Sequence, residues 1–317
     1  LEGSIFFVIS QASSLDPEKK LPVFLYIVRH ERAGFSSSAI YVYSWHPFAV
    51  SIMTSPTFKS TLKITHVGTA TAVLNIDGVN LLTDPFFSPA GTEFDVGIAT
   101  LKNADGPALG LADLPPIDAV LLSHEDHPDN LDELGRKLLD GRKVLTTVDG
   151  AKNLQPRPGV RGLRPWETVP LVAGGKHFRI TGTPCQHLPG GECTGFIIES
   201  DSFGSNEGLP NVIYFSGDTV YIDELTRIRE KYHVTVALLN LGAAVAPLPN
   251  GPVQITMDGK QAARLFREIK ADILVPMHFE SWGHFTQFGK DLARVFEAED
   301  IQDKVCWLTP GEEKEVI

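Results

Sequence analysis

The chain has 317 residues, of which 43% are hydrophobic and 21% charged, a composition typical of a globular protein with a sizeable core. Its formal net charge of −11 argues against a partner bound mainly through a phosphate backbone, because such binding needs clustered Lys and Arg. No apolar run approaches the ~20 residues that a membrane-spanning helix requires. We therefore expect neither a nucleic-acid partner nor stable membrane insertion.

The cysteines and the N-terminal region bear on location and domain organisation. Three cysteines, Cys185, Cys193 and Cys306, show no paired spacing, so we expect a reducing, cytoplasmic compartment. Residues 1–52 show no sustained hydrophobic period, and the first methionine is Met53. We interpret residues 1–58 as an N-terminal extension, either non-native or disordered, and residues 59–317 as one folded domain.

The first elements of this domain are predicted to form a strand meander. Residues 62–67 alternate apolar and polar side chains, as a half-buried strand does. Strands at 71–76 and 79–82 are joined by Asp77-Gly78, a strong signal for a hairpin turn. Residues 88–116 are rich in Gly, Pro and Ala, which predicts a long loop, either a lid over a site or a passive insertion.

Strands and helices alternate through the rest of the chain. Further strands are predicted at 117–123, 143–147, 178–183, 195–199, 212–215, 234–239, 273–276 and 304–308. Helices are predicted at 131–139, 222–231, 256–270 and 289–297. The order gives two strand-rich halves with helices outside, a four-layer αββα sandwich of the α/β class.

Four predicted strands end directly before a residue that can bind a metal ion. These residues are His124, His187, Asp218 and His278. Rigid strand ends hold such residues in fixed relative positions, and imidazole and carboxylate are suitable ligands for Zn²⁺ and related ions. Their spacings along the chain are long, so only tertiary folding can bring them together.

The residues around these strand ends resemble the metallo-β-lactamase superfamily. Its motifs follow in order at 122–124 (LSH), 127–132 (HPDNLD), His187, 216–219 (SGDT) and 276–278 (PMH). The similarity covers about residue 61 to the C-terminus. It is greatest to the branch of predicted zinc hydrolases that includes ascorbate-phosphate lactonases and the N-acyl phosphatidylethanolamine phospholipase D. Residues 65–71 (THVGTAT) and 83–85 (TDP) also fit that branch.

The resemblance implies a four-layer αββα metallo-β-lactamase sandwich with a metal centre. One ion would be held by His124, His127 and His187, and a second by Asp129, Asp218 and His278, with Asp218 bridging the two. Asp129 would also orient the attacking hydroxide and is the implied catalytic residue. The resemblance implies one or two Zn²⁺ ions, with Mn²⁺ or Fe²⁺ as alternatives at the second site.

The sequence departs from the family motif His-x-His-x-Asp-His. It reads His-x-x-His-x-Asp-Asn, one residue longer, and Asn130 stands where the last histidine is expected. Another register takes 124–127 as the His-x-Asp-His half and makes Asp126 and His127 ligands of the second site. We favour the first register because the flanking residues fit it without further shifts. Both registers leave the second site short of a histidine, so a mononuclear enzyme is an open alternative.

Five further residues are candidates around the metal ions. Asn130, Trp282 and His284 are expected to contact the substrate, although the last two could instead belong to a loop anchored by aromatic side chains. Asp84 and His66 are expected to orient metal ligands. The alternatives are a turn residue for Asp84 and a packed histidine for His66.

The function implied is a metal-dependent hydrolase that uses a zinc-bound hydroxide on a small acyl substrate, a lactone or lactam. One alternative is a phosphodiesterase of a small or lipid phosphodiester. The other is a non-catalytic metal-binding protein with a decayed second site. We expect a small-molecule substrate, leave a homo-oligomer open, and expect the loops 88–116 and 243–255 to determine substrate choice.

Overall fold

The computed structural model describes residues 9–12, 23–32, 35–43, 57–97 and 99–317, and the chain divides into two units, Leu1–Ser55 and Pro56–Ile317. In the first unit an antiparallel sheet has the order β1 (Ile9–Ala12), β2 (Val23–Arg32), β3 (Phe35–Tyr43). Sequence periodicity predicted no element there, but β2 is rich in the β-branched and aromatic residues that favour strands. Met53, considered as a start residue, lies outside the described residues.

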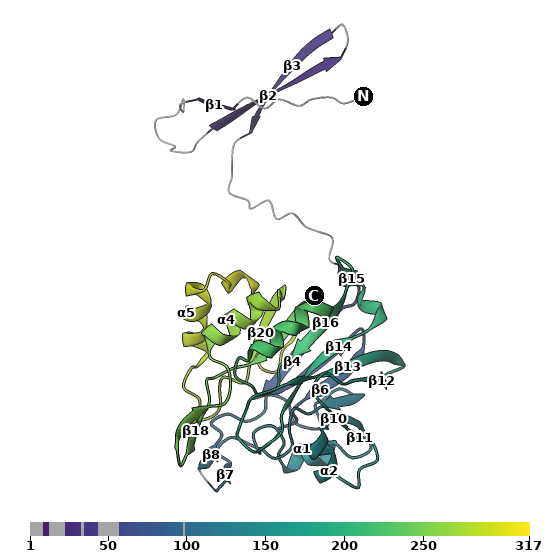
Figure 1. Ribbon diagram of the computed structural model, residues 1–317, viewed down its shortest axis with the longest axis vertical. Coiled ribbons are helices and arrows are strands. Elements are labelled where there is room, and N and C mark those ends of the chain that lie inside the picture. The colour runs from purple at the N-terminus through teal and green to yellow at the C-terminus, as the bar shows by residue number, and fades with distance from the viewer. Residues whose placement is uncertain (1–8, 13–22, 33–34, 44–56, 98) are drawn as a thin grey trace. The chain divides into compact units, whose positions relative to one another are not determined.

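The second unit contains two seven-stranded sheets (Figure 1). The first sheet has the order β11-β10-β9-β6-β5-β4-β21. Its strands are β4 (Leu62–Gly68), β5 (Thr71–Ile76), β6 (Val79–Thr83), β9 (Ala119–Leu121), β10 (Lys143–Thr147), β11 (Val160–Leu163) and β21 (Glu313–Glu315). Asp77 and Gly78, with φ of 47° and 88°, form the predicted turn between β5 and β6.

The second sheet has the order β12-β13-β14-β16-β17-β20, and β15 pairs with β16. Its strands are β12 (Thr168–Ala173), β13 (Lys176–Pro184), β14 (Thr194–Glu199), β15 (Ser205–Asn206), β16 (Leu209–Phe215), β17 (His233–Asn240) and β20 (Ile273–Met277). Two small hairpins lie outside both sheets: β7 (Glu93–Asp95) with β8 (Thr100–Lys102), and β18 (Val245–Leu248) with β19 (Gly251–Gln254). They fall in the two loops that were expected to shape the site.

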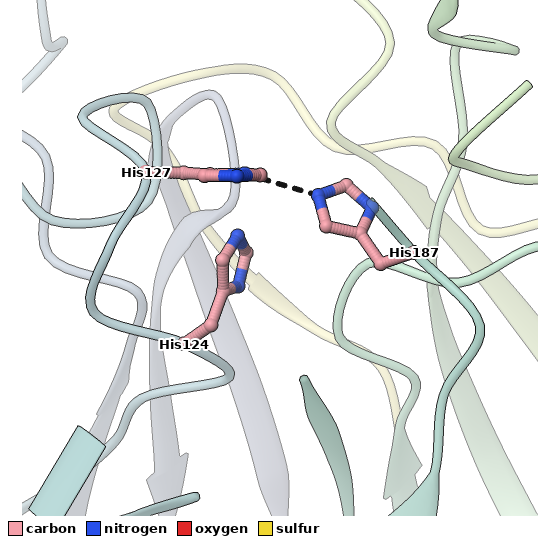
Figure 2. A group of neighbouring side chains, drawn as sticks. All are labelled: His124, His127 and His187. Carbon is pink, nitrogen blue, oxygen red and sulfur yellow. Dashed lines mark hydrogen bonds between the residues drawn. The ribbon is translucent and has the colours of Figure 1, made fainter. Parts of the chain in front are cut away.

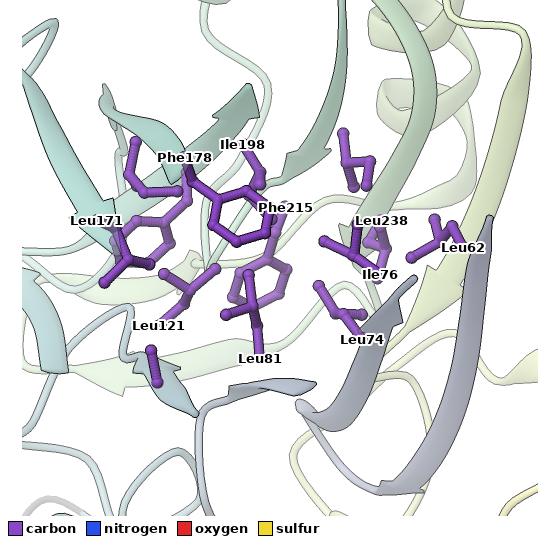
Figure 3. Packing of buried hydrophobic residues seen from close by; sticks show 14 of the residues in the cluster. Leu62, Leu74, Ile76, Leu81, Leu121, Leu171, Phe178, Ile198, Phe215 and Leu238 are labelled. Atoms are coloured by element: carbon purple, nitrogen blue, oxygen red, sulfur yellow. The ribbon is translucent and has the colours of Figure 1, made fainter. Parts of the chain in front are cut away.

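The main core lies between the inner faces of the two sheets (Figure 3). Leu74 and Leu81 of the first sheet and Ile198, Phe215 and Leu238 of the second belong to one fully buried cluster. Each such side chain contributes about 1.5–3 kcal/mol when it is removed from water. The sandwich therefore gives the loops at its edge a rigid base.

Helices cover the two outer faces, on opposite sides of the sandwich (Figure 1). On one side α4 (Gly259–Glu268) and α5 (Gly289–Ala298) bury Leu265 and Leu292 in a cluster that includes Tyr214 of the second sheet. On the other, α1 (Glu133–Leu138) buries Leu138 in a cluster with Val120 of the first sheet. The remaining helices are α2 (Val148–Asn153) and α3 (Ile228–Lys231). The predicted αββα sandwich is confirmed.

Two predicted elements differ in the structure. Residues 222–231, predicted as one helix, form a 3₁₀ segment (Asp223–Arg227) followed by the single α-turn of α3. Residues 304–308 form no strand: Val305 makes one isolated bridge to Leu274, and the last strand is β21. Among the described residues, no helix has the length and apolar character needed to cross a membrane.

Candidate metal centre

Four strands that precede predicted metal-binding residues end on the same side of their sheets. Strand β9 is parallel to β6 and β10, while β16 is parallel to β17, which is parallel to β20. Strand β13 is antiparallel to β14, which is antiparallel to β16, so β13 and β16 run in the same direction. The chain beyond these ends carries His124, His187, Asp218 and His278. The long spacings of the sequence therefore converge in space.

Three of the predicted histidines form the first donor group, His124, His127 and His187, whose candidate ligand atoms lie within 4.8 Å of one another. Figure 2 shows the three rings turned toward a common point. The Nε2 atom of His187 lies 3.1 Å from Nδ1 of His127. The Nε2 atom of His124 is buried and has no hydrogen-bond partner among the described residues. Such a cluster of imidazole nitrogens is suited to one shared cation.

Hydrogen bonds determine which ring nitrogen of two histidines is free. Nδ1–H of His187 donates to the carbonyl of Ile255 at 2.7 Å, which leaves the Nε2 lone pair for the cluster. Nδ1 of His124 lies 2.8 Å from the Ser123 hydroxyl, which itself donates to Asp84 at 2.8 Å. Burial lowers the pKa of His187, and burial together with the neighbouring imidazoles holds that of His124 well below its usual range. Both rings are therefore neutral, the form that binds metal ions.

The second donor group is Asp129, Asp218 and His278, again with ligand atoms within 4.8 Å of one another. Nε2 of His278 lies 3.3 Å from Oδ2 of Asp218 and 3.7 Å from Oδ2 of Asp129. Asn240 donates to Oδ1 of Asp218 at 2.7 Å and so fixes the orientation of this carboxylate. Although burial acts to raise it, nearby His278 holds the pKa of Asp218 well below its usual value. This side chain is therefore an anionic donor.

Both donor groups fit a metal ion by a second criterion, the state of their buried polar atoms. Oδ1 of Asp129 and Nδ1 of His278 are buried and lack hydrogen-bond partners among the described residues. Buried polar atoms without partners cost free energy, so an orphaned set of this kind indicates a site that binds a cation. With three imidazoles in the first group and two carboxylates in the second, the donor chemistry matches a first-row divalent ion.

The geometry distinguishes the two registers of the motif that begins at His124. His127 lies in the first donor group and Asp129 in the second, as the favoured register has it. Asp126, a ligand in the other register, is exposed and belongs to neither group. The extra residue in the motif thus lies in the loop between His124 and His127 and leaves both donors in place.

Comparison with known proteins identifies the family of the chain. The family model described as "Beta-lactamase superfamily domain" matches residues 79–279. The chain belongs to the β-lactamase superfamily. A "UPF0173 metal-dependent hydrolase" of Methanosarcina mazei is 28% identical over 256 residues, which are 79% of this chain and 97% of that protein. A protein of the same name from Methanoculleus marisnigri is 30% identical over 64% of this chain and 82% of its own.

Solved structures of other hydrolases show the same fold. An isothiocyanate hydrolase from Delia radicum gut bacteria has a TM-score of 0.66 at 24% identity and covers 80% of this chain and 98% of its own. A possible metal-dependent hydrolase from Veillonella parvula has a TM-score of 0.65 at 19% identity and covers 82% of this chain and 100% of its own. At the level of enzyme class, the chain is a metal-dependent hydrolase of the metallo-β-lactamase fold.

Asp84 and His66 were expected to orient metal ligands. Both contact groups that hold candidate ligands. Asp84 is fully buried and accepts hydrogen bonds from Ser123. Nε2–H of His66 donates at 3.0 Å to the carbonyl of Thr69, and the backbone N–H of His278 donates to the same oxygen at 3.1 Å. His66 therefore contacts the turn that holds the backbone of His278.

The structure places the three residues that were expected to contact substrate in different environments. Asn130 is fully buried, and its amide donates to Asp84 at 3.1 Å, away from the cavity wall. Trp282 is 1% exposed and packs edge-on against Phe86, so it anchors the loop, which was the alternative reading. His284 does line the cavity. Only the last of the three has access to a bound molecule in this structure.

Sequence reasoning missed several groups that hold the superfamily donors in place. These are the Ser123 hydroxyl, the Asn240 amide and the backbone carbonyl of Ile255. The Asn240 amide and the Ile255 carbonyl give no signal in a single sequence. Ser123 does give a signal, because it directly precedes a ligand at a strand end.

A cavity of about 720 Å³ opens onto both donor groups. Its floor includes His127, His187, Asp129, Asp218 and His278. Phe94 and Leu101 of the β7–β8 hairpin and Val245 and Ala246 of the β18–β19 hairpin form part of its walls. The two loops singled out in the sequence thus both contribute to the space where a substrate can bind.

Proposed function

We propose that the chain hydrolyses a small, uncharged or cationic acyl substrate such as a lactone or lactam, with metal ions held by its two donor groups. The observation that carries the proposal is that members of both groups line a single cavity of about 720 Å³. Small-molecule sites commonly have volumes of roughly 300–1,000 Å³. The cavity is therefore of the right size for one small ring substrate placed against the donors.

The donor sets assign a role to each group. The first donor group would hold one ion and the second another, and we propose Zn²⁺ for the three-histidine group. When bound, such ions polarise a carbonyl and lower the pKa of coordinated water to about 7. Asp129 is the residue placed to accept a proton, because its Oδ1 atom makes no hydrogen bond to the described residues and its side chain lines the cavity.

The charge of the cavity wall favours an acyl substrate over a phosphodiester. Carboxylates beyond the two donor groups also line it: Glu93, Asp95, Glu125, Asp126, Asp132 and Glu133. Of the described lining residues, Arg136 alone is a Lys or Arg, and its guanidinium donates to the carboxylate of Glu125 at 2.9 Å. A phosphodiester would pass these negative charges on its way to the metal ions, and no unpaired Lys or Arg among the described lining residues would offset them. A neutral lactone or lactam has no such electrostatic cost.

A substrate panel on the metal-loaded protein tests the proposal. Neutral lactones, lactams and bis-p-nitrophenyl phosphate are compared for kcat/KM with the wild type and with His187→Ala. We expect turnover of a lactone or lactam by the wild type and its loss in the variant, together with loss of metal.

Two results would contradict the proposal. Turnover of the phosphodiester alone would show that the chain is a phosphodiesterase and not an acyl hydrolase. Undiminished acyl hydrolysis by His187→Ala at full metal content would show that the first donor group does not serve the reaction. The exposed His177, replaced by Ala, is the matched control for loss of an imidazole.

A further inference from the structure

We infer that His284 supplies a fourth donor to the second group, so that its ion would be held by two carboxylates and two imidazoles. The inference rests on the proposed function, since it concerns the same metal centre. It changes the role of His284 from a substrate contact to a metal ligand.

The distances around Asp129 carry the inference. Its Oδ2 atom lies 3.7 Å from Nε2 of His278 and 3.9 Å from Nε2 of His284. Two ligands bound tetrahedrally to one Zn²⁺ ion at about 2.0–2.2 Å are separated by roughly 3.4 Å. Both separations exceed hydrogen-bonding distance and come within a few tenths of an ångström of that value. Both imidazoles therefore lie near one carboxylate oxygen, at separations that two ligands of a common ion can have.

His284 is held in this position by a well-anchored loop. Its carbonyl accepts a hydrogen bond from the backbone N–H of Val245 at 3.2 Å, and the N–H of Phe285 donates to Trp282 at 3.3 Å. The ring packs edge-on against Phe285, with centroids 4.9 Å apart, and Phe285 packs edge-on against His278 at 5.0 Å. One phenyl ring thus fixes both imidazoles, which is the preorganisation that a metal ligand needs.

The second donor group has three donors, Asp129, Asp218 and His278, whereas a tetrahedral shell has four positions. His284 would supply the fourth. Asn130, which occupies the place of a histidine in the motif, is fully buried and its amide is bound to Asp84. The missing imidazole cannot come from that position, and His284 approaches Asp129 from a different segment of the chain.

His284 could also contact substrate, because it lines the cavity and is partly exposed. The two roles make different predictions for metal binding. A substrate contact changes KM and leaves metal affinity alone, whereas a ligand changes the affinity of one ion selectively. A measurement of metal binding without substrate therefore separates them.

The experiment is a Zn²⁺ titration of chelator-stripped protein against a competing chromophoric chelator, without substrate. Wild type, His284→Ala, His284→Gln and the control His177→Ala are compared, with thermal melting to verify folding. We expect two ions per chain in the wild type and the control. In both His284 variants the first ion should keep its affinity and the second should weaken by at least about tenfold, because loss of a residue that only supports a ligand already costs 10–100-fold.

Cobalt substitution gives an independent readout. Loss of one ligand should change the visible absorption of the second Co²⁺ ion and leave that of the first unchanged. Two ions bound with wild-type affinity by folded His284→Ala, with a change confined to KM, would overturn the inference. A wild type that binds only one ion would overturn it too, and would leave the hydrolase assignment standing. Absence of any metal-dependent turnover would instead defeat the proposed function.

Discussion

Asp84 accepts two hydrogen bonds from Ser123, from the backbone N–H at 2.6 Å and from the hydroxyl at 2.8 Å. The same hydroxyl lies 2.8 Å from Nδ1 of His124. Because a hydroxyl has only one proton, Nδ1 of His124 must be the donor in that contact. A buried carboxylate therefore orients a candidate metal ligand through one serine, and leaves its Nε2 atom free for the cluster with His127 and His187.

Ser123→Ala should weaken the first metal site. The substitution removes the acceptor that fixes the tautomer and orientation of His124 but leaves the ligand itself. We expect the affinity of the first ion to fall about 10–100-fold with the fold retained. Chelator competition measures this, and Ser202→Ala, which removes an exposed hydroxyl, is the control. Equal affinities for Ser123→Ala and the wild type would show that the serine does not support the site.

Asp84 should make the stability of the metal-free protein depend on pH. Burial, followed by the charge of Asp218, raises the pKa of Asp84 to about 7 in the folded state. In the unfolded chain it is about 4. The folded state thus binds the proton more tightly, so this contribution to stability is complete below about pH 4 and is lost as the pH rises through about 7.

Urea unfolding of chelator-treated protein across that range checks the pH effect. The free energy of unfolding of the wild type should fall with rising pH relative to that of Asp84→Asn, which has no proton to lose. Above about pH 7 the difference should become constant. Parallel curves for the two proteins from pH 4 to 7 would rule out a raised pKa at Asp84.

Gly217→Ala should destabilise the fold and displace Asp218. Gly217 has a φ of 58°, and a Cβ atom there would lie 2.5 Å from the carbonyl oxygen of Thr194 and 2.9 Å from Cβ of Ser123. We expect the free energy of unfolding to fall by about 2–5 kcal/mol from strain and overpacking together. Gly175→Ala, with a φ of 77° and open space around it, should cost only about 1–2 kcal/mol. Similar losses in both variants would mean that the backbone strain alone matters at Gly217.

The acidic cavity wall predicts how salt affects turnover. For an anionic lactone, kcat/KM should rise as salt screens the repulsion, because the Debye length falls from about 30 Å at 0.01 M to about 8 Å at 0.15 M. For a neutral lactone of the same ring size it should stay constant. Initial rates at several ionic strengths measure both. A decline for the anionic substrate would indicate an attractive cation in the cavity and would contradict the argument against phosphodiesters.

The fold could be predicted where burial imposes a period. Strands β4 to β6 were found at nearly their true bounds. The half-buried β4 alternates apolar and polar residues, β5 and β6 are short buried runs, and Asp77-Gly78 marks the turn between them. Strand β21 was missed because its residues, Glu-Lys-Glu, are all exposed and show no apolar pattern. The apolar run at 304–308 suggested a strand, but its side chains pack beside β20 and only Val305 forms a bridge.

The candidate site could be predicted from residue type and strand ends, but its supporting contacts could not. His124, His187, Asp218 and His278 each follow an apolar strand, so their convergence followed from topology. The position of His284 beside Asp129 depends on how a loop folds back, which no local pattern encodes. The inward turn of Asn130 toward Asp84 likewise appears only once the chain is folded.

Anomalous X-ray scattering at the zinc edge, from crystals of the zinc-loaded protein, shows where the ions bind. We expect one peak among the ring nitrogens of His124, His127 and His187, and another bounded by Asp129, Asp218, His278 and His284. Zinc bound elsewhere on the chain, with both of these positions empty at full loading, would contradict this expectation.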